Sequence, residues 1–348
     1  MHKDRCGKSF NGQNISANRV IMRFIDLFCG AGLGARGAVN AGATPVLGID
    51  SWGLATQSFK DNFPDSDVIT SRIEDLNPSV FSSKYQVEVL LASPECTSHS
   101  IARGSKTGQE KSRETAFRIL PWIKAFFPRW VVVENVVRMR KWERHTELKQ
   151  EIEKLSYSVS EFVLNAADLG APQARKRLFL ICDRAGTPPN YRDFANYFLT
   201  KPKPAKSIID WSHRWQTSLL FTPTRAGNTL ERAERAIKAL GNGEPFIIVY
   251  YGSDYAGGWQ TLDAPLRTIT TLDRFALVTF ERGDYRMRML QPPELLRAMG
   301  AENHKLCVGS RRDKVKLCGN GVCSTVMEVV FKEIIRITNR KVPIIQAN

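Results

Sequence analysis

Short apolar runs alternate with amphipathic segments through the first half of the chain. Continuous apolar runs, typical of buried strands, occur at residues 23–28, 44–49, 87–92, 130–135 and 178–182. Helical spacing of apolar positions occurs between them, at residues 34–41, 54–62, 115–126 and 148–155. Short strands that alternate with helices indicate an open α/β sheet.

The pattern loses this regularity after about residue 185. Proline- and glycine-rich breakers interrupt it at residues 201–204 and 241–243. Strands are predicted at residues 246–251 and 266–271, without a long helix between them. This part of the chain is therefore predicted to form a smaller and more irregular domain.

We divide the chain into four parts on this basis. The polar residues 1–22 lack periodicity and are predicted to be a flexible extension. Residues 23–185 form the first domain and residues 186–300 the irregular one. A long amphipathic helix is predicted at 322–336, so residues 301–348 are assigned to a segment that returns to the first sheet.

The amino-acid composition indicates a soluble-type core and a strongly basic chain. The chain has 348 residues with 50 Lys+Arg and 35 Asp+Glu, a formal net charge of +15. A hydrophobic fraction of 43% suits a globular chain and excludes a mostly disordered one. The basic excess favours a polyanionic partner, most simply a nucleic acid.

The positive charge is segregated along the chain. Residues 23–100 carry 5 basic and 9 acidic side chains, a net charge of −4. Residues 101–150 have a net charge of +7, and residues 201–250 one of +4. A polyanion is therefore expected against the later blocks rather than against the first strands.

Nothing in the sequence predicts a membrane segment, a disulfide framework or a metal site. No apolar run reaches the roughly 20 residues that span a bilayer, and no signal peptide follows the first residues. The seven cysteines are irregularly spaced, which argues against paired disulfides and against zinc. We therefore expect a cytoplasmic protein with no membrane partner and no metal.

Three glycines follow the first predicted strand. Gly30, Gly32 and Gly34 come directly after it, and Asp50 ends the next strand. Glycines at such a turn let the backbone approach a ligand, and the acid can reach ribose hydroxyls. A nicotinamide dinucleotide and S-adenosylmethionine both suit this pattern, and a purely structural turn would also produce it.

Two side chains at other strand ends are candidates for catalysis. Cys96 follows the strand at 87–92, where a thiol would lie at the ligand edge of the sheet. Glu134 ends the apolar strand at 130–135, where burial should raise its pKa and a protonated carboxyl could hold a ring nitrogen. A small buried cysteine and a surface acid are the structural alternatives.

Six segments, taken together, resemble the ordered motifs of the cytosine-5 DNA methyltransferases. They are Asp26–Gly32, Pro94–Cys96, Glu134–Val136, Asp168–Arg177, Arg288–Glu294 with Arg297–Gly300, and Gly319–Val322. The resemblance covers about residues 23–336. It implies an α/β fold with a Rossmann-like, S-adenosylmethionine-dependent methyltransferase sheet and a smaller, irregular target-recognition domain.

The resemblance implies methyl transfer from S-adenosylmethionine to C5 of a flipped-out cytosine in a specific duplex DNA sequence, with S-adenosylhomocysteine as product. Cys96 would add to C6 of the base. Glu134 would contact N3 and the exocyclic amine, and Arg177 would hydrogen-bond O2. Arg175 would support the Cys96 loop and a nearby phosphate.

The resemblance also implies two sets of binding residues. The cofactor would lie against the glycine turn and the neighbouring strand ends, with Asp50 on the ribose and Ile73 against the adenine. Its expected contacts are Phe28, Cys29, Gly30, Ala31, Gly32, Leu33, Asp50, Ser51, Ile73 and Asn320. The expected DNA contacts are Ser98, Ser100, Arg103, Lys106, Arg113, Gln173, Thr270, Thr271 and Arg274. Which bases they read does not follow from the sequence, because Arg and Thr contact several base edges.

Three positions depart from the family pattern. Glu95 stands where the family usually has Pro, and a carboxylate beside Cys96 disfavours the thiolate. The acid that would face the adenine amino group is replaced near Arg72, where Glu74 would take that role. Ser51 replaces an apolar or aromatic neighbour of the adenine. The cofactor pocket is therefore expected to differ in detail, and a modified S-adenosylmethionine stays open.

Two alternatives to a DNA methyltransferase follow from the same resemblance. One is a cytosine-5 methyltransferase that acts on RNA, against which the dedicated recognition domain argues. The other is a non-catalytic DNA-binding regulator, against which the joint presence of Cys96, Glu134, Arg175 and Arg177 argues. The expected state is a monomer on double-stranded DNA, in a bacterium or encoded by a phage, with a separately acting restriction endonuclease as a further partner.

Overall fold

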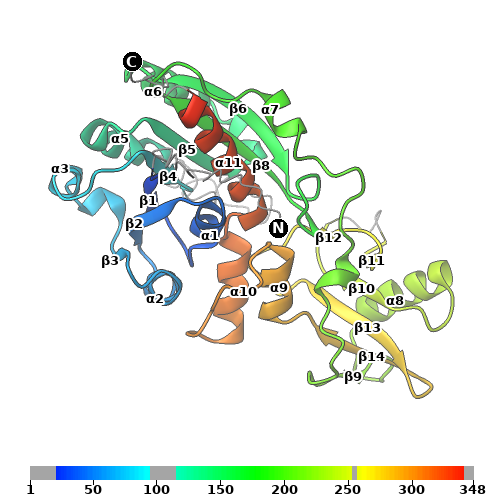
Figure 1. The fold of residues 1–348 in the computed structure, drawn as a ribbon. Coiled ribbons are helices and arrows are strands. Elements are labelled where there is room, and N and C mark those ends of the chain that lie inside the picture. The colour runs from blue at the N-terminus through cyan, green and yellow to red at the C-terminus, as the bar shows by residue number, and fades with distance from the viewer. Residues whose placement is uncertain (1–20, 95–114, 253–256, 341–348) are drawn as a thin grey trace, which may run out of the picture.

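A seven-stranded sheet forms the larger part of the molecule (Figure 1). The computed structural model describes residues 21–94, 115–252 and 257–340. The strands of this sheet, in spatial order, are β3 (Asp67–Thr70), β2 (Thr44–Asp50), β1 (Arg23–Leu27), β4 (Val89–Ala92), β5 (Trp130–Val136), β8 (Lys176–Asp183) and β6 (Ser158–Asn165). Strands β1 to β5 pair in parallel, and β8 pairs antiparallel with both β5 and β6. The expected Rossmann-like α/β sheet is confirmed.

Alternate residues of the buried strands pack against helices on opposite faces. Phe24 of β1 meets Phe331 at a ring-centroid distance of 5.4 Å, on the face covered by α1 (Leu33–Asn40), α2 (Gly53–Asn62) and α11 (Ser324–Arg340). Its neighbour Ile25 shares a buried cluster with Trp122, on the face of α3 (Pro78–Ser82), α5 (Leu120–Phe126) and α6 (His145–Lys154). Continuous apolar strands result because both faces are covered.

The winding direction of the sheet reverses between β1 and β4. Strands β2 and β3 lie on one side of β1, and β4 and β5 lie on the other. Such a reversal opens a crevice at the carboxyl ends of the two central strands, which is where ligands bind in this type of fold. The residues that follow β1 and β4 are therefore the first candidates for a site.

A second, antiparallel sheet forms a separate small core. Its spatial order is β11 (Trp259–Thr261), β10 (Phe246–Val249), β13 (Phe275–Glu281), β14 (Asp284–Met289) and β9 (Ser218–Leu219). Helix α8 (Gly227–Leu240) packs on this sheet through Ala233 and Ala236, which share a buried cluster with Phe246 and Val278. This sheet lies within the predicted irregular domain.

Helices α9 (Pro292–Ala298) and α10 (Arg311–Asn320) lie between the two sheets, in orange in Figure 1. Helix α7 (Tyr191–Ala195) packs beside α11, and its Phe194 meets Phe162 of β6 at a ring-centroid distance of 5.3 Å. The remaining short helices are η1 (Ile73–Asp75), η2 (Thr115–Ile119), η3 (Val137–Lys141) and η4 (Ala205–Ile208).

The strand predicted at 266–271 is wrong beyond its first two residues. Only β12 (Leu266–Arg267) is a strand, paired in parallel with β7 (Gln173–Ala174). Beyond it, the Ile269 amide donates to Gln173 Oε1 at 2.9 Å, and the Tyr251 hydroxyl donates to the Thr268 carbonyl at 2.8 Å. Because side chains satisfy these backbone groups, the segment needs no partner strand.

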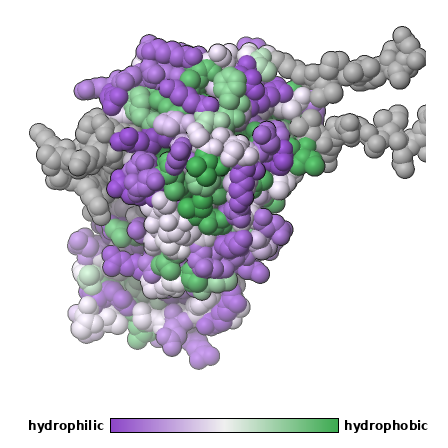
Figure 2. Space-filling view, turned by 90° about the vertical axis from the view of Figure 1, so that its left-hand side faces the viewer, coloured by the Kyte–Doolittle hydropathy of each residue, from purple (hydrophilic) through white to green (hydrophobic). Residues whose placement is uncertain are grey.

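The surface carries both polar and apolar side chains. The face in Figure 2 shows hydrophilic residues over much of its described part, with hydrophobic residues gathered between them. This mixture is ordinary for a surface in contact with water. Within the described ranges, no helix is both long and apolar enough to cross a bilayer.

Candidate active site

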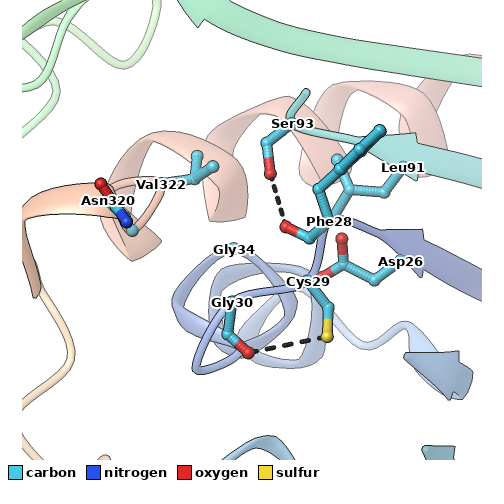
Figure 3. Close-up of a pocket in the computed structure, with 10 residues that line it drawn as sticks. Asp26, Phe28, Cys29, Gly30, Gly34, Leu91, Ser93, Asn320 and Val322 are labelled. Carbon is cyan, nitrogen blue, oxygen red and sulfur yellow. Dashed lines mark hydrogen bonds between the residues drawn. The ribbon is translucent and has the colours of Figure 1, made fainter. Parts of the chain in front are cut away.

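A pocket lies at the carboxyl ends of β1 and β4, where the winding reverses (Figure 3). Figure 3 shows Asn320 and Val322 on one side of it, across from Phe28, Leu91 and Asp26. The residues that line it are Asp26, Phe28, Cys29, Gly30, Gly34, Leu91, Ser93, Asn320, Gly321 and Val322. The pocket is thus built from three segments that lie far apart in the sequence.

The turn after β1 has a backbone that favours glycine. Gly30 has φ +53° and Gly32 has φ +82°, both in the left-handed region. A Cβ on Gly32 would lie 2.6 Å from a ring carbon of Phe63, whereas a Cβ on Gly30 would meet nothing within 4 Å. Gly32 therefore lets the turn pack closely on Phe59 of α2 and on Phe63, which follows α2, and Gly30 leaves its backbone open to the pocket.

Asp50 holds this turn from the end of β2. Its two carboxylate oxygens each accept a backbone hydrogen bond of 2.9 Å, from Gly30 and from Trp52. Burial raises the pKa of Asp50, although these amides and the charge of Lys316 oppose that effect. The carboxylate keeps further lone pairs, so it can also accept from a ligand hydroxyl.

Asp26 is the charged residue among several pocket residues that were not predicted as cofactor contacts. Its side chain is 2% exposed, and within the described part of the chain its carboxyl group has no hydrogen-bond partner. Burial, followed by the nearby charge of Asp50, raises the pKa of Asp26 well above its usual range. A buried carboxyl that faces a pocket is suited to a cationic ligand group. The signal was an acid inside an otherwise apolar strand.

The other expected cofactor contacts fall into two groups. Phe28, Cys29, Gly30 and Asn320 do line the pocket. The next three residues of the turn do not: Ala31, Gly32 and Leu33 are buried, and the Ala31 carbonyl accepts from Nε2 of the buried His304 at 2.6 Å.

Ser51 and Ile73 lie in opposite environments. Ser51 is exposed, while Ile73 is 2% exposed within an apolar cluster under the sheet. Neither is among the residues that line the pocket.

His304 supports the glycine turn through its hydrogen bond to the Ala31 carbonyl. It lies outside every recognised motif, so no sequence pattern pointed to it.

The buried Glu134 pairs with the half-buried Arg177, on strands that neighbour the pocket strand β4. Glu134 stands near the end of β5, and Arg177 on the adjacent strand β8 places Nε 3.2 Å from Glu134 Oε1. Burial raises the pKa of Glu134, and the charges of Arg177 and Arg175 only partly oppose this. The pair therefore combines a carboxyl that protonates easily with a fixed cation.

Asn135 ties this pair to the strand end that precedes Cys96. Its Nδ2 donates to the Pro94 carbonyl at 3.1 Å, and its Oδ1 accepts from the Val136 amide at 2.8 Å. The residue two positions before Cys96 is thus anchored to the residue next to Glu134. Sequence reasoning gave Asn135 no role, although it lies within a recognised motif.

Two expectations for the 173–177 run need correction. Gln173 was expected to contact DNA, but it is fully buried, with Nε2 donating to the Ala298 carbonyl at 3.2 Å. Arg175 was expected to reach a phosphate, but it is 2% exposed and its guanidinium donates to the carbonyls of Ile269, Gly319 and Gly321. Burial inside the protein therefore keeps both side chains from DNA. The expected support of the Cys96 loop by Arg175 stays a prediction, because that loop lies outside the described residues.

The remaining candidates are exposed or lie outside the described residues. Thr271 is exposed, Thr270 bonds the Leu272 backbone, and one Arg274 nitrogen donates to the Tyr250 carbonyl at 2.9 Å. The residues outside the described ranges are Glu95, Cys96, Ser98, Ser100, Arg103, Lys106 and Arg113.

In the described part of the chain, no group of three or more His, Cys, Asp or Glu side chains could hold a metal ion. The pocket itself presents the Asp26 carboxyl group, the Phe28 ring and the Gly30 backbone.

The family model for C-5 cytosine-specific DNA methylases matches residues 22–336. This protein belongs to that family. The matched range contains the pocket, the Glu134–Arg177 pair and both sheets. The family assignment rests on the whole domain rather than on any one motif.

Individual relatives share less of the chain. It is 31% identical to the type II methyltransferase M.HhaI of Haemophilus parahaemolyticus over 189 residues, which cover 52% of this chain and 53% of that one. It is 27% identical to the human tRNA (cytosine(38)-C(5))-methyltransferase over 207 residues, or 56% and 52% of the two chains. The chain spans about half the length of the curated relatives it matches.

Solved structures share the fold at low identity. The S. pombe Dnmt2 methyltransferase aligns with a TM-score of 0.65 at 15% identity, over 92% of this chain and 98% of that one. The Entamoeba histolytica methyltransferase EhMeth also gives 0.65, at 13% identity over 90% and 99%.

Proposed function

We propose that the protein transfers a methyl group from S-adenosylmethionine to C5 of a flipped-out cytosine in duplex DNA, through a covalent bond between Cys96 and C6. One arrangement carries this proposal. The pocket, the strand end that leads to Cys96 and the Glu134–Arg177 pair meet at one edge of the sheet, joined by the Asn135–Pro94 hydrogen bond.

The pocket fits the cofactor of this family. S-adenosylmethionine carries an ammonium group, a sulfonium and ribose hydroxyls. The pocket offers the Asp26 carboxyl group and an open glycine backbone, and the Asp50 carboxylate lies behind that backbone on the Gly30 amide. Asp26 would hold the ammonium, Asp50 would accept from the ribose, and Phe28 and Asn320 would flank the ligand. When bound, the cofactor supplies an electrophilic methyl group.

The protein's own residues would activate the base. The Cys96 thiolate would add to C6 while Glu134, whose pKa is raised by burial, donates a proton to N3. Arg177, fixed by its pairing with Glu134, would donate to O2. C5 then accepts the methyl group and loses its proton to a base. The C6–S bond breaks to return the thiolate, and N3 returns its proton to Glu134.

We infer that the five-stranded sheet and the segment 268–274, which leads into β13, form the target-recognition unit. Thr271 and Leu272 are exposed beside the pocket wall, and Arg274 is fixed to Tyr250. The net charge of +4 over residues 201–250 favours phosphates here. We propose that the protein acts as a monomer on double-stranded DNA.

Bisulfite sequencing of DNA from cells that express the protein tests the proposal and reveals the target. We expect protected cytosines in one short sequence context for the wild type and none for Cys96→Ser or Glu134→Gln. Protection that persists in Cys96→Ser would exclude the covalent mechanism. Circular dichroism of both variants controls for folding.

RNA is the second candidate substrate, because the human relative named above acts on tRNA. Label transfer from S-adenosylmethionine into duplex DNA and into tRNA, measured side by side, decides between them. We expect label in DNA only. Label in tRNA alone would replace the DNA proposal with the RNA one.

A further inference from the structure

Two side chains of the 173–177 run form hydrogen bonds with the backbone of Ile269. Its amide donates to Gln173 Oε1 at 2.9 Å, and its carbonyl accepts from Arg175 Nη1 at 3.0 Å. The preceding Thr268 hydroxyl donates to the Ala174 carbonyl at 2.7 Å. The start of the recognition segment, residues 268–274, is therefore fastened to the residues that precede β8 of the large sheet, in addition to its bond from Tyr251 beside the small sheet.

Arg175 also contacts the residues at the end of α10 that form one wall of the pocket. Its Nη2 donates at 3.0 Å to the carbonyls of both Gly319 and Gly321, at the end of α10. With 2% of the residue exposed, these bonds are formed away from water, where breaking them would leave polar groups unsatisfied. Gly321 itself lines the pocket, together with Asn320 and Val322.

The recognition segment also touches α10 directly. A Cβ on Gly319 would lie 2.3 Å from the Thr270 carbonyl oxygen, so only glycine lets the segment approach this closely. At the other end of the helix, Arg311 pairs with Asp273 and donates to the Leu290 carbonyl at 2.8 Å. The segment is thus attached to both ends of α10.

We propose that Arg175 is a positioning residue that joins the recognition segment, residues 268–274, to residues 319–322, which form one wall of the pocket. A ligand that orders either of these two segments would then order the other. This inference rests on the proposed function of the pocket. A cofactor that orders the wall would then also order the segment that faces DNA. By reciprocity, bound DNA would strengthen cofactor binding.

Hydrogen exchange of the full chain, with S-adenosylhomocysteine as the probe, tests the coupling without catalysis. In the wild type we expect saturating probe to slow amide exchange both in residues 28–34 and in residues 266–272, by at least about fivefold in the latter. In Arg175→Gln we expect the effect on 28–34 to remain and the effect on 266–272 to disappear. Wild-type protection confined to 28–34, or unchanged protection of 266–272 in the variant, would overturn the proposal.

Arg274→Gln is the matched control, because Arg274 lies in the same segment but bonds Tyr250 instead of α10. Arg274→Gln should keep the protection of both regions. Loss of protection at 266–272 in Arg274→Gln would contradict a specific role for Arg175. If Arg175→Gln does not fold, Gly319→Ala disturbs the same contact through the Thr270 carbonyl and should uncouple the regions likewise. No protection anywhere in the wild type would refute the cofactor site itself, a result distinct from a loss confined to the variants.

Discussion

Three acids with raised pKa values lie at the proposed site; two are buried and Asp50 is half-buried. Burial raises the pKa of Asp26, Asp50 and Glu134, and each stands at or near the carboxyl end of a strand. Groups held in such costly environments are a usual sign of a binding or catalytic site. Asp26 is the clearest case because, unlike Asp50, its carboxyl has no backbone amide to offset its burial within the described chain.

The substitution Asp26→Asn should raise stability and weaken cofactor binding. A raised pKa in the folded state means that Asp26 favours folding fully below its unfolded pKa of about 3.9, and that this contribution is lost as pH rises through the folded value. Removing the carboxylate should therefore stabilise the protein at pH 7 by about 1–3 kcal/mol. Urea unfolding at pH 5 and pH 7 measures this, and the gain should be larger at pH 7.

Calorimetric titration with S-adenosylhomocysteine measures the second half of that prediction. The affinity of Asp26→Asn should fall, because the amide cannot neutralise an ammonium group. A variant that is less stable at pH 7 yet binds normally would show that Asp26 has only a structural role.

At the scale of elements, the apolar strands of the large sheet were predictable because burial on both faces leaves a continuous hydrophobic run. Strands β3 and β6 were not predicted, since both are largely half-buried or exposed and carry polar residues. The segment 268–271 has strand-like residues, but contacts from Gln173 and Arg175 give it another conformation. Such tertiary contacts leave no trace in local periodicity.

Two glycines of one turn should respond differently to alanine. Gly32→Ala places a methyl group against Phe63 and Phe59 at positive φ, so we expect it to destabilise the fold by about 2–4 kcal/mol. Gly30→Ala meets no atom within 4 Å and should cost only about 1–2 kcal/mol of backbone strain.

The same methyl group on Gly30 would occupy the pocket, so Gly30→Ala should lose affinity for S-adenosylhomocysteine while it stays folded. Thermal unfolding and calorimetric binding separate the two effects. Normal binding by Gly30→Ala would place the ligand elsewhere.

At the scale of the whole molecule, the site joins the ends of β1, β4 and β5 to the end of α10. Motif order was sufficient to predict that Phe28, Gly30 and Asn320 would meet. It did not show that Gln173 and Arg175 face inward, because their carbonyl partners come from α9, α10 and the recognition segment. A motif identifies residues that matter, but only the fold shows what they touch.

The charge distribution predicts how the two ligands should respond to salt. DNA should bind the basic blocks that follow residue 100, so its affinity should fall at least about tenfold between 50 and 200 mM salt. S-adenosylhomocysteine should bind the net-negative first block, so its affinity should change little with salt. Fluorescence anisotropy with labelled duplex and calorimetry with S-adenosylhomocysteine measure the two, and salt-independent DNA binding would contradict the assignment of the basic surface.

The proposed function depends on a covalent bond between Cys96 and C6 of cytosine during methyl transfer. A duplex library of random sequence, with 5-fluorocytosine replacing cytosine in one strand, traps that bond because fluorine cannot leave C5 as a proton does. We predict a complex that survives denaturing electrophoresis, requires S-adenosylmethionine, and maps to Cys96 by mass spectrometry. No stable complex with the wild type, or an equal amount with Cys96→Ser, would contradict the account.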